Sequence, residues 1–208
     1  MKNKFNLGIA GNIGVGKTTL TEKLSNDLGF SPIYESVIDN PYLSDFYNDM
    51  SRWSFNLQIY FLYTRFESQV KLLESNSSFI QDRTIYEDKE IFASNLVELG
   101  HMSDRDFKTY CEIFNAMLKF VKRPDLIIYL QANTDTLMSR IKNRKRDYEL
   151  DISSEYIHSL NIYYDRWINK LPKEDVLIVK TDDFDVFNDK EFYDNIVSDI
   201  KNRIYGEK

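Results

Sequence analysis

Residues 11–18, with the sequence GNIGVGKT, fit the phosphate-binding pattern G-x-x-x-x-G-K-[ST]. Glycines at these positions let backbone N–H groups point at phosphate oxygens, and a helix that starts here adds partial positive charge. Lys17 is expected to reach the β- and γ-phosphates, and the Thr18 hydroxyl to bind Mg²⁺. The pattern therefore predicts a nucleoside triphosphate site, whose residues are Gly11, Asn12, Ile13, Gly14, Val15, Gly16, Lys17, Thr18 and Thr19.

Charged side chains follow two further segments that read as strands. Glu35 comes after residues 31–34, and Asp82 and Arg83 come after residues 78–81. In phosphoryl transfer to an alcohol, a carboxylate can accept the hydroxyl proton, and Glu35 is the candidate. Asp82 could orient the metal shell through water, and Arg83 could steady the acceptor and the transferred group. Each of these residues taken singly could equally be a solvated loop residue.

A basic run interrupts this acidic chain at residues 140–146, with the sequence RIKNRKR. Arg140 and Arg144 are four residues apart and share a helix face. Such a run is usually a solvated surface, but beside a phosphate-binding loop a lid that closes over the triphosphate is favoured. We expect this lid to cover about residues 140–150.

Two polar residues lie on one face of an otherwise apolar helical pattern at residues 52–74. Gln58 and Arg65 are seven residues apart, which is about two helical turns. The amide of Gln58 could pair with the edge of a nucleobase. The alternative, that both side chains face solvent, stays open on periodicity alone.

The elements that must position these residues alternate along the chain. Predicted strands cover residues 5–10, 31–34, 78–81, 125–130 and 175–180, and predicted helices cover residues 19–28, 52–74, 104–121, 133–144, 153–170 and 189–204. This alternation predicts an α/β fold with a five-stranded parallel sheet that is covered by helices on both faces. Ligands bind at the carboxyl ends of such strands, where the charged residues lie.

The composition restricts the classes of binding partner and the cellular compartment that we expect for this protein. With 208 residues, the chain is expected to form one domain, residues 1–208. The net charge of −6 argues against nucleic-acid or anionic-membrane binding, and no apolar run is long enough to span a membrane. Cys111 is the single cysteine, which excludes an internal disulfide and fits a protein of the reducing cytoplasm.

Five ordered motifs resemble the deoxynucleoside kinase family over nearly the whole chain. They read GNIGVGKTT, YES, YNDMSRWSFNLQ, DRTIYEDKEIFASNL and RIKNRKRDYE. The resemblance implies a P-loop kinase fold, transfer of the ATP γ-phosphate to the 5′-hydroxyl of a deoxynucleoside with Mg²⁺, and a homodimer.

The resemblance also implies roles at matching positions. Glu35 corresponds to the general base and Arg83 to the arginine beside the 5′-oxygen, so that Glu35, Arg83 and Lys17 form the catalytic set. The family positions for the sugar 3′-hydroxyl are Tyr47 and Glu149, and those for the base are Gln58 and Phe92. The lid arginines correspond to Arg140, Arg144 and Arg146, and the loop expected to touch the donor base contains Asp182, Asp183 and Phe184. One departure is Asp82, where many relatives carry Glu.

Base preference is expected to depend on Arg65 and Asp88. These residues match a charged pair at the base edge in the purine and deoxycytidine branch of the family. A carboxylate accepts from the exocyclic amine of adenine or cytosine but faces the O4 acceptor of thymine unfavourably. We therefore expect deoxyadenosine as the substrate, as in small bacterial deoxyadenosine kinases, while deoxyguanosine and deoxycytidine stay open.

Three other functions compete with this interpretation. A nucleoside monophosphate kinase of the thymidylate kinase type shares the loop and the lid, but it would need extra cations for the acceptor phosphate and no base such as Glu35. A nucleotide-binding subunit without turnover would not need the full set Lys17, Thr18, Glu35 and Arg83. A GTPase would carry an N-K-x-D segment after the fourth predicted strand, where this chain reads QANTD.

Overall fold

The computed structural model describes residues 4–35, 40–73, 77–149, 151–183 and 189–206. Its centre is one parallel sheet of five strands in the order β2-β3-β1-β4-β5. The strands are β1 (Asn6–Gly11), β2 (Ser31–Ile33), β3 (Phe79–Asp82), β4 (Leu126–Gln131) and β5 (Val176–Lys180). The predicted parallel sheet is confirmed, and each boundary lies within one residue of the predicted one.

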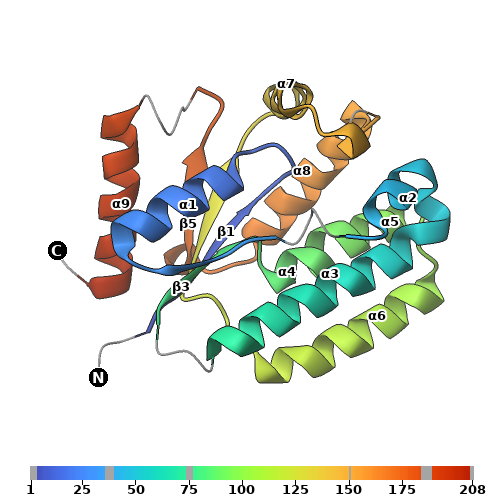
Figure 1. The fold of residues 1–208 in the computed structure, drawn as a ribbon, viewed down its shortest axis with the longest axis horizontal. Coiled ribbons are helices and arrows are strands. Elements are labelled where there is room, and N and C mark those ends of the chain that lie inside the picture. Colours follow the sequence, from blue (N-terminus) through green and yellow to red (C-terminus); the bar gives the residue numbers. More distant parts are fainter. Residues whose placement is uncertain (1–3, 36–39, 74–76, 150, 184–188, 207–208) are drawn as a thin grey trace.

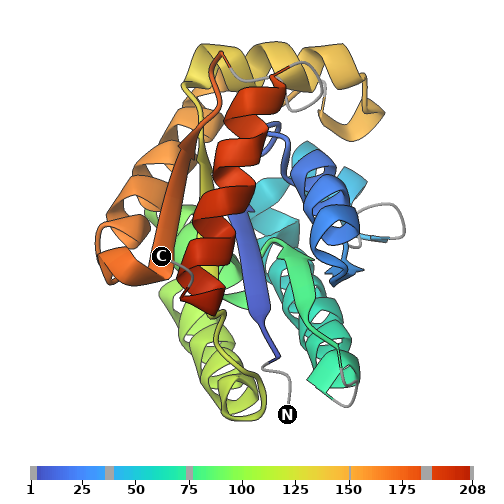
Figure 2. The same ribbon diagram turned by 90° about the vertical axis from the view of Figure 1, so that its left-hand side faces the viewer.

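Helices cover both faces of the sheet. They are α1 (Lys17–Leu28), α2 (Leu43–Asn48), α3 (Met50–Leu73), α4 (Ile85–Glu87), α5 (Ser94–Glu98), α6 (Asp104–Met117), α7 (Thr134–Arg144), α8 (Ser154–Ile168) and α9 (Lys190–Tyr205). Figure 1 shows α1 and α9 on one side of the sheet and α3, α6 and α8 on the other. Turned by 90°, Figure 2 shows α9 in front of the strands and α7 lying across their upper end. That upper end is the carboxyl edge of the sheet.

The central strands are buried on both faces. All six residues of β1 and all four residues of β3 are buried. Leu7 and Ile9 of β1, Ile80 of β3 and Ile128 of β4 are fully buried and belong to one continuous hydrophobic core. Burial on both faces explains why these strands read as unbroken apolar runs rather than as alternating patterns.

Helix ends follow local capping chemistry. Asn133 and Ser153 stand before α7 and α8, and each side chain accepts a hydrogen bond from the backbone N–H three residues on. Gly29 ends α1 in the left-handed conformation, with φ of 67°, and its N–H donates to the carbonyl of Ser25. These caps fix the ends of helices that carry site residues.

The helical segment after β3 was not among the predicted helices. It begins as α4, continues as a π-helix, η1 (Asp88–Ala93), and ends as α5. A π-helical turn disturbs the 3.6-residue period on which a helix prediction depends, and such turns are frequent at functional sites. Short 3₁₀ turns, η2 (Leu118–Phe120), η3 (Asp147–Glu149) and η4 (Lys173–Asp175), complete the elements, and η2 replaces the last turn of the helix predicted at residues 104–121.

Candidate active site

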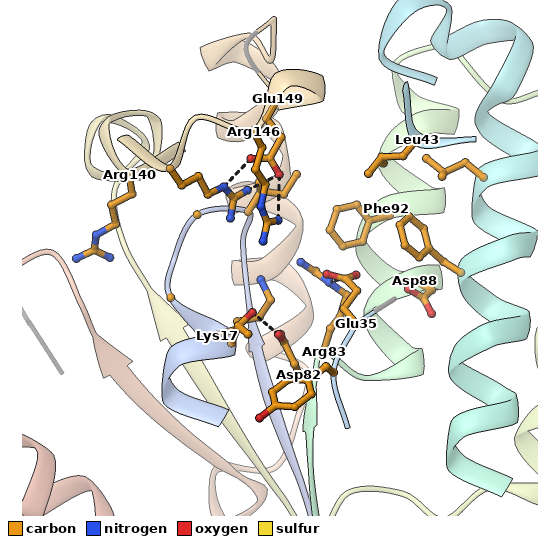
Figure 3. Close-up of a pocket in the computed structure, with 18 of the residues that line it drawn as sticks. Lys17, Glu35, Leu43, Asp82, Arg83, Asp88, Phe92, Arg140, Arg146 and Glu149 are labelled. Atoms are coloured by element: carbon orange, nitrogen blue, oxygen red, sulfur yellow. Dashed lines mark hydrogen bonds and ion pairs between the residues drawn. The ribbon is translucent and has the colours of Figure 1, made fainter. Parts of the chain in front are cut away.

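A cavity of about 810 Å³ opens at the carboxyl edge of the sheet. Its volume is in the range of small-molecule sites. Most of the predicted site residues line it, from five separate parts of the chain: Ile13, Gly14, Gly16, Lys17, Thr18, Thr19, Glu35, Tyr47, Gln58, Asp82, Arg83, Asp88, Phe92, Arg140, Arg144, Arg146 and Glu149. Figure 3 shows the lid residues on one side of the cavity, Leu43 and Phe92 on the other, and Glu35 and Arg83 between them.

The predicted phosphate-binding loop joins β1 to α1. Gly14 and Gly16 have φ angles of 84° and 101°, which a residue with a side chain adopts only with strain. The ammonium of Lys17 is buried and donates to the backbone oxygens of Gly11 and Asn12, both at 2.9 Å. Burial and the nearby Arg83 lower the pKa of Lys17 to about 8. The loop and its lysine have the arrangement that cradles a triphosphate.

The predicted metal-binding pair is in contact. Thr18 Oγ1 donates to Asp82 Oδ2 at 2.5 Å, whereas Asp82 Oδ1 is buried and has no hydrogen-bond partner among the described residues. Burial raises the pKa of Asp82, and Lys17 opposes this effect. A buried carboxylate oxygen without a partner, beside a threonine hydroxyl, fits the oxygen-rich shell that Mg²⁺ prefers. Thr18 and Asp82 therefore fit a Mg²⁺ ion that accompanies a bound triphosphate.

Glu35 lies between two arginines. Its Oε1 accepts from Arg83 Nε at 3.0 Å and from Arg65 Nη2 at 3.1 Å. Burial alone would raise the pKa of Glu35, but Arg83, Arg65 and Lys17 together lower it to about 2. Arg83 itself has a φ angle of 75°, which is rare for a residue with a side chain and is typical of functional sites.

The predicted base pocket lies beyond Glu35. Arg65 binds Asp88 through two hydrogen bonds, Nε to Oδ2 at 2.7 Å and Nη2 to Oδ1 at 3.0 Å. Gln58 is buried, lines the cavity, and has no partner for its Oε1 among the described residues. The guanidinium of Arg83 lies over the Phe92 ring at 4.4 Å from its centroid. The alternative that Gln58 and Arg65 face solvent is therefore wrong.

Asp88 is fully covered by its surroundings. Burial raises its pKa to about 6, although Arg65 opposes this shift. A carboxyl group with this pKa is mostly ionised at neutral pH and can then accept hydrogen bonds from an amine.

Two of the lid arginines are paired with a carboxylate of the same segment. Arg144 Nε and Nη2 each lie 2.5 Å from Glu149, and Arg146 Nη1 lies 3.6 Å from it. Arg140 instead turns away from them (Figure 3), and donates to the carbonyl oxygens of Val15, at 3.4 Å, and Thr181. Arg140 thus ties α7 to the phosphate-binding loop.

A few of the predicted site residues do not line the cavity. Gly11, Asn12, Val15, Arg65, Asp182 and Asp183 lie outside its lining. The side chain of Asn12 turns to α8 and donates to the carbonyl of Ile157 at 2.9 Å. Asp182 Oδ1 accepts from the backbone N–H of Asn133 at 2.8 Å and so supports the start of α7. Phe184 lies outside the described residues.

The sequence interpretation missed several residues of the site. Tyr34, Leu43, Phe46, Leu57, Phe61 and Tyr156 line the cavity as well. Behind it, Glu87 is fully buried and accepts from Thr84, Arg83 and Gly11. The pattern T-x-x-E at residues 84–87 is a capping-box signature and could have revealed Glu87.

Two kinds of feature are absent from the residues that the structure describes. No helix there is long and apolar enough to cross a membrane. No group of three or more His, Cys, Asp or Glu side chains in the same part of the chain could hold a metal ion by itself.

Comparisons with known proteins show the family to which this chain belongs. A family model described as deoxynucleoside kinase matches residues 7–205. The chain is 42% identical to a deoxyadenosine/deoxycytidine kinase of Bacillus subtilis (strain 168), over 96% of this chain and 93% of that one. It is 46% identical to a deoxyadenosine kinase of Dictyostelium discoideum, over 76% of this chain and 65% of that one. A solved structure of deoxyadenosine kinase from M. mycoides with bound dATP superposes with a TM-score of 0.81, at 31% identity, and covers 93% of this chain and 100% of that one. The sequence, the fold and the cavity agree, and the chain belongs to the deoxynucleoside kinase family.

Proposed function

We propose that this deoxynucleoside kinase transfers the γ-phosphoryl group of ATP to the 5′-hydroxyl of deoxyadenosine, for nucleotide salvage. The observation that carries the choice of base is the Arg65–Asp88 pair at the cavity that Gln58 also lines. The amide oxygen of Gln58 has no partner among the residues that the structure describes. The carboxylate of Asp88 and the amide oxygen of Gln58 offer acceptors to the N6 amine of adenine. The relatives named as a deoxyadenosine/deoxycytidine kinase and a deoxyadenosine kinase support the same choice.

The base-edge argument separates the candidate nucleosides. Thymine would place its O4 acceptor against Asp88 and leave buried polar groups unpaired, which costs about 1–3 kcal/mol for each group. Cytosine carries an amine at N4 and satisfies the same carboxylate. Guanine could use O6 against Arg65. Deoxycytidine and deoxyguanosine are therefore secondary substrates in this proposal, and thymidine is a poor one.

The acceptor hydroxyl has a place beside Glu35 and Arg83. The carboxylate of Glu35 is ionised across the working pH range, because its pKa is about 2. It holds the 5′-hydroxyl by accepting its hydrogen bond, and it takes the proton as the bond to phosphorus forms. Arg83 donates toward the acceptor oxygen and the transferred group, where negative charge develops.

The donor side is built from Lys17, Thr18, Asp82 and the lid. Lys17 neutralises charge on the β- and γ-phosphates. Thr18 and Asp82 would hold Mg²⁺, which when bound screens the phosphate charges and aligns them. The lid is proposed to cover residues 140–150, with Arg144 and Arg146 turning to the triphosphate.

The sugar and donor-base contacts are also proposals. Tyr47 and Glu149 line the cavity together and would hold the 3′-hydroxyl. Phe92 would stack on the base. The loop with Asp182, Asp183 and Phe184 would face the donor base.

A nucleoside monophosphate kinase of the thymidylate kinase type fits the site less well. Its acceptor phosphate would meet the carboxylate of Glu35, which is already engaged with Arg83 and Arg65. Like charges in a buried site repel strongly. The acceptor side therefore suits a neutral nucleoside.

Steady-state phosphorylation with Mg-ATP tests the function. The acceptors are deoxyadenosine, deoxyguanosine, deoxycytidine, thymidine, adenosine and thymidine monophosphate, offered in parallel. We expect the highest kcat/KM for deoxyadenosine and near-background turnover of thymidine. Thymidine as the best substrate would contradict the base-edge argument, and activity on the monophosphate alone would contradict the role of Glu35.

Assembly and compartment complete the proposal. We infer a homodimer from the family resemblance. A cytoplasmic location is supported by the single cysteine, Cys111, which leaves no internal disulfide.

A further inference from the structure

A buried network behind the cavity connects the phosphate-binding loop with Arg83. Glu87 ends α4 and is fully buried. Its Oε1 accepts from the backbone N–H of Gly11 and from Arg83 Nη1, both at 3.3 Å. Its Oε2 accepts from the backbone N–H of Thr84 at 2.7 Å. One carboxylate therefore holds the first residue of the loop and the arginine beside the acceptor.

Tyr164 of α8 completes this network, and its ring is fully buried. Its hydroxyl oxygen lies 2.5 Å from Arg83 Nη1, 2.8 Å from the carbonyl oxygen of Gly11 and 2.8 Å from Glu87 Oε1. Arginine can only donate, so the hydroxyl accepts from Arg83. Its single hydrogen then has two acceptors at equal distance, Gly11 and Glu87.

The contacts of Lys17 determine whether the Gly11 carbonyl or Glu87 receives the hydroxyl hydrogen of Tyr164. An ammonium has three donors. Two of them now serve the carbonyls of Gly11 and Asn12. When Lys17 reaches both the β- and γ-phosphates, its three donors cannot also serve both carbonyls. The Asn12 carbonyl also accepts from the backbone N–H of Val15, at 3.4 Å, whereas the Gly11 carbonyl has Tyr164 as its other side-chain donor. An unpaired buried carbonyl costs free energy, and the hydroxyl of Tyr164 is in position to supply the carbonyl of Gly11.

We propose that Glu87 and Tyr164 are positioning residues that couple triphosphate binding at Lys17 to Arg83. With the loop empty, the Tyr164 hydrogen is shared with Glu87. With triphosphate bound, the hydrogen turns to Gly11, and Glu87 is left to Arg83 and the N–H of Gly11. The carboxylate then holds the guanidinium more firmly. Arg83 needs this support, since its backbone is in the strained left-handed region, with φ of 75°.

This inference rests on the proposed phosphoryl transfer, but its main test is binding. The nucleoside affinity is measured by calorimetry with and without a saturating magnesium complex of a β,γ-imido ATP analogue. The variants are Tyr164→Phe, which removes only the hydroxyl, and Glu87→Gln, which removes the charge. The matched control is Tyr129→Phe, because this ring stacks on Tyr164 at 5.6 Å while its hydroxyl faces Asp165.

We expect the analogue to lower the deoxyadenosine Kd about fivefold or more, both in the unaltered protein and in Tyr129→Phe. In Tyr164→Phe this ratio should fall to about one. A partly unfolded sample lowers the number of sites but leaves each Kd unchanged, so loss of folded protein cannot imitate the result. A ratio near one in the unaltered protein, or an unchanged ratio in Tyr164→Phe, overturns the proposal.

Steady-state kinetics provide a second test of this proposal. At saturating ATP, Tyr164→Phe should raise the deoxyadenosine KM about fivefold, because the effect of bound triphosphate on nucleoside affinity is lost. Per competent site it should also lower kcat about tenfold, because Arg83 is held less firmly in the transition state. Unchanged turnover in this variant would also overturn the proposal. If Glu87→Gln fails to fold, Tyr164→Phe still decides. Failure of the unaltered protein to phosphorylate any deoxynucleoside would contradict the proposed function and leave the binding ratios interpretable.

Discussion

The charged groups that we propose surround the acceptor are paired with one another in the structure. Glu35 contacts Arg83 and Arg65, and Arg65 contacts Asp88. Removal of one partner from such a buried set leaves an uncompensated charge, which is costly. Conservative replacements that keep the shape are therefore the informative ones at this site.

Glu35→Gln should keep the fold and the affinity for deoxyadenosine while kcat falls about 100-fold or more, because the amide cannot accept the hydroxyl proton. Calorimetric binding and steady-state rates measure the two quantities. Glu112→Gln, at an exposed position on α6, is the control for loss of a carboxylate. Near-normal turnover in Glu35→Gln would remove Glu35 from the mechanism.

Binding of deoxyadenosine should weaken at acid pH. The pKa of Asp88 is about 6 in the free protein, and the bound base needs the carboxylate form. Below that pH a proton must be lost on binding, so Kd should rise by up to about tenfold per pH unit. Calorimetry from pH 5 to 8 without ATP measures this. Asp88→Asn should bind more weakly with a flat profile, and an equally steep profile in that variant would assign the titration to another group.

Among the secondary-structure elements, those on the donor side of the site can be predicted from the sequence more completely than those on the acceptor side. The phosphate-binding loop is local: its glycines, Lys17 and Thr18 are adjacent in sequence, and a buried strand and a helix flank it. The strands of a parallel sheet are continuous apolar runs, so their positions were predicted within one residue. A sequence pattern predicts the structure correctly where the residues that form the feature are adjacent in the chain.

The acceptor side depends on contacts between distant segments. Helix α2 is only six residues long, too short for a periodic signal, and the π-helical turn of η1 breaks the period that would reveal its helix. Glu87 and Tyr164 are 77 residues apart, and only the packed sheet brings them together. The pairing of Arg144 with Glu149 likewise needs the fold of the lid. Family resemblance, rather than pattern, supplied most acceptor-side roles.

Gly14 is the point where the loop meets the lid helix. A Cβ atom on Gly14 would lie 2.8 Å from Ile141 Cγ1 and 3.1 Å from the carbonyl oxygen of Leu137, both on α7. Gly14→Ala should therefore displace α7 and raise the KM for ATP about tenfold or more, through misplacement of the site. ATP kinetics with thermal unfolding as a check measure the effect.

Gly29→Ala is the matched control for Gly14→Ala. Gly29 also has positive φ, 67°, but a Cβ there meets no atom within 4 Å. It should lose about 1–2 kcal/mol of stability from backbone strain and leave the KM for ATP unchanged. Equal effects of the two substitutions on KM would show that strain alone, rather than contact with α7, governs the loop.

At the scale of the molecule, strand order divides the site. β1 is central, with β3 on one side and β4 on the other. The strands β2 and β3 lead to Glu35 and Arg83, whereas β4 leads into α7 and the lid arginines. The loop after β1 lies between them, at the switch point where such sheets bind ligands. In the proposed function, donor and acceptor thus meet over the central strand.

Analytical ultracentrifugation should show a homodimer of twice the 24.7 kDa chain mass. Exposed aromatic side chains support an interface, with Tyr63 of α3 51% exposed and Phe120 of η2 67% exposed. Burial of such side chains stabilises association. A mass of one chain across the accessible concentration range would contradict this proposal.

The contact between Glu149 and the lid arginines has a consequence for selectivity inside a cell. An arginine cluster without a nearby acid attracts every phosphate ester and free phosphate ion that reaches it. In this lid each visitor must compete with a carboxylate that already holds Arg144 through two bonds. We expect weak, singly bound anions to lose that competition and a triphosphate that the loop anchors to win it. In the proposed function, Glu149 would thus exclude background phosphate and admit the donor.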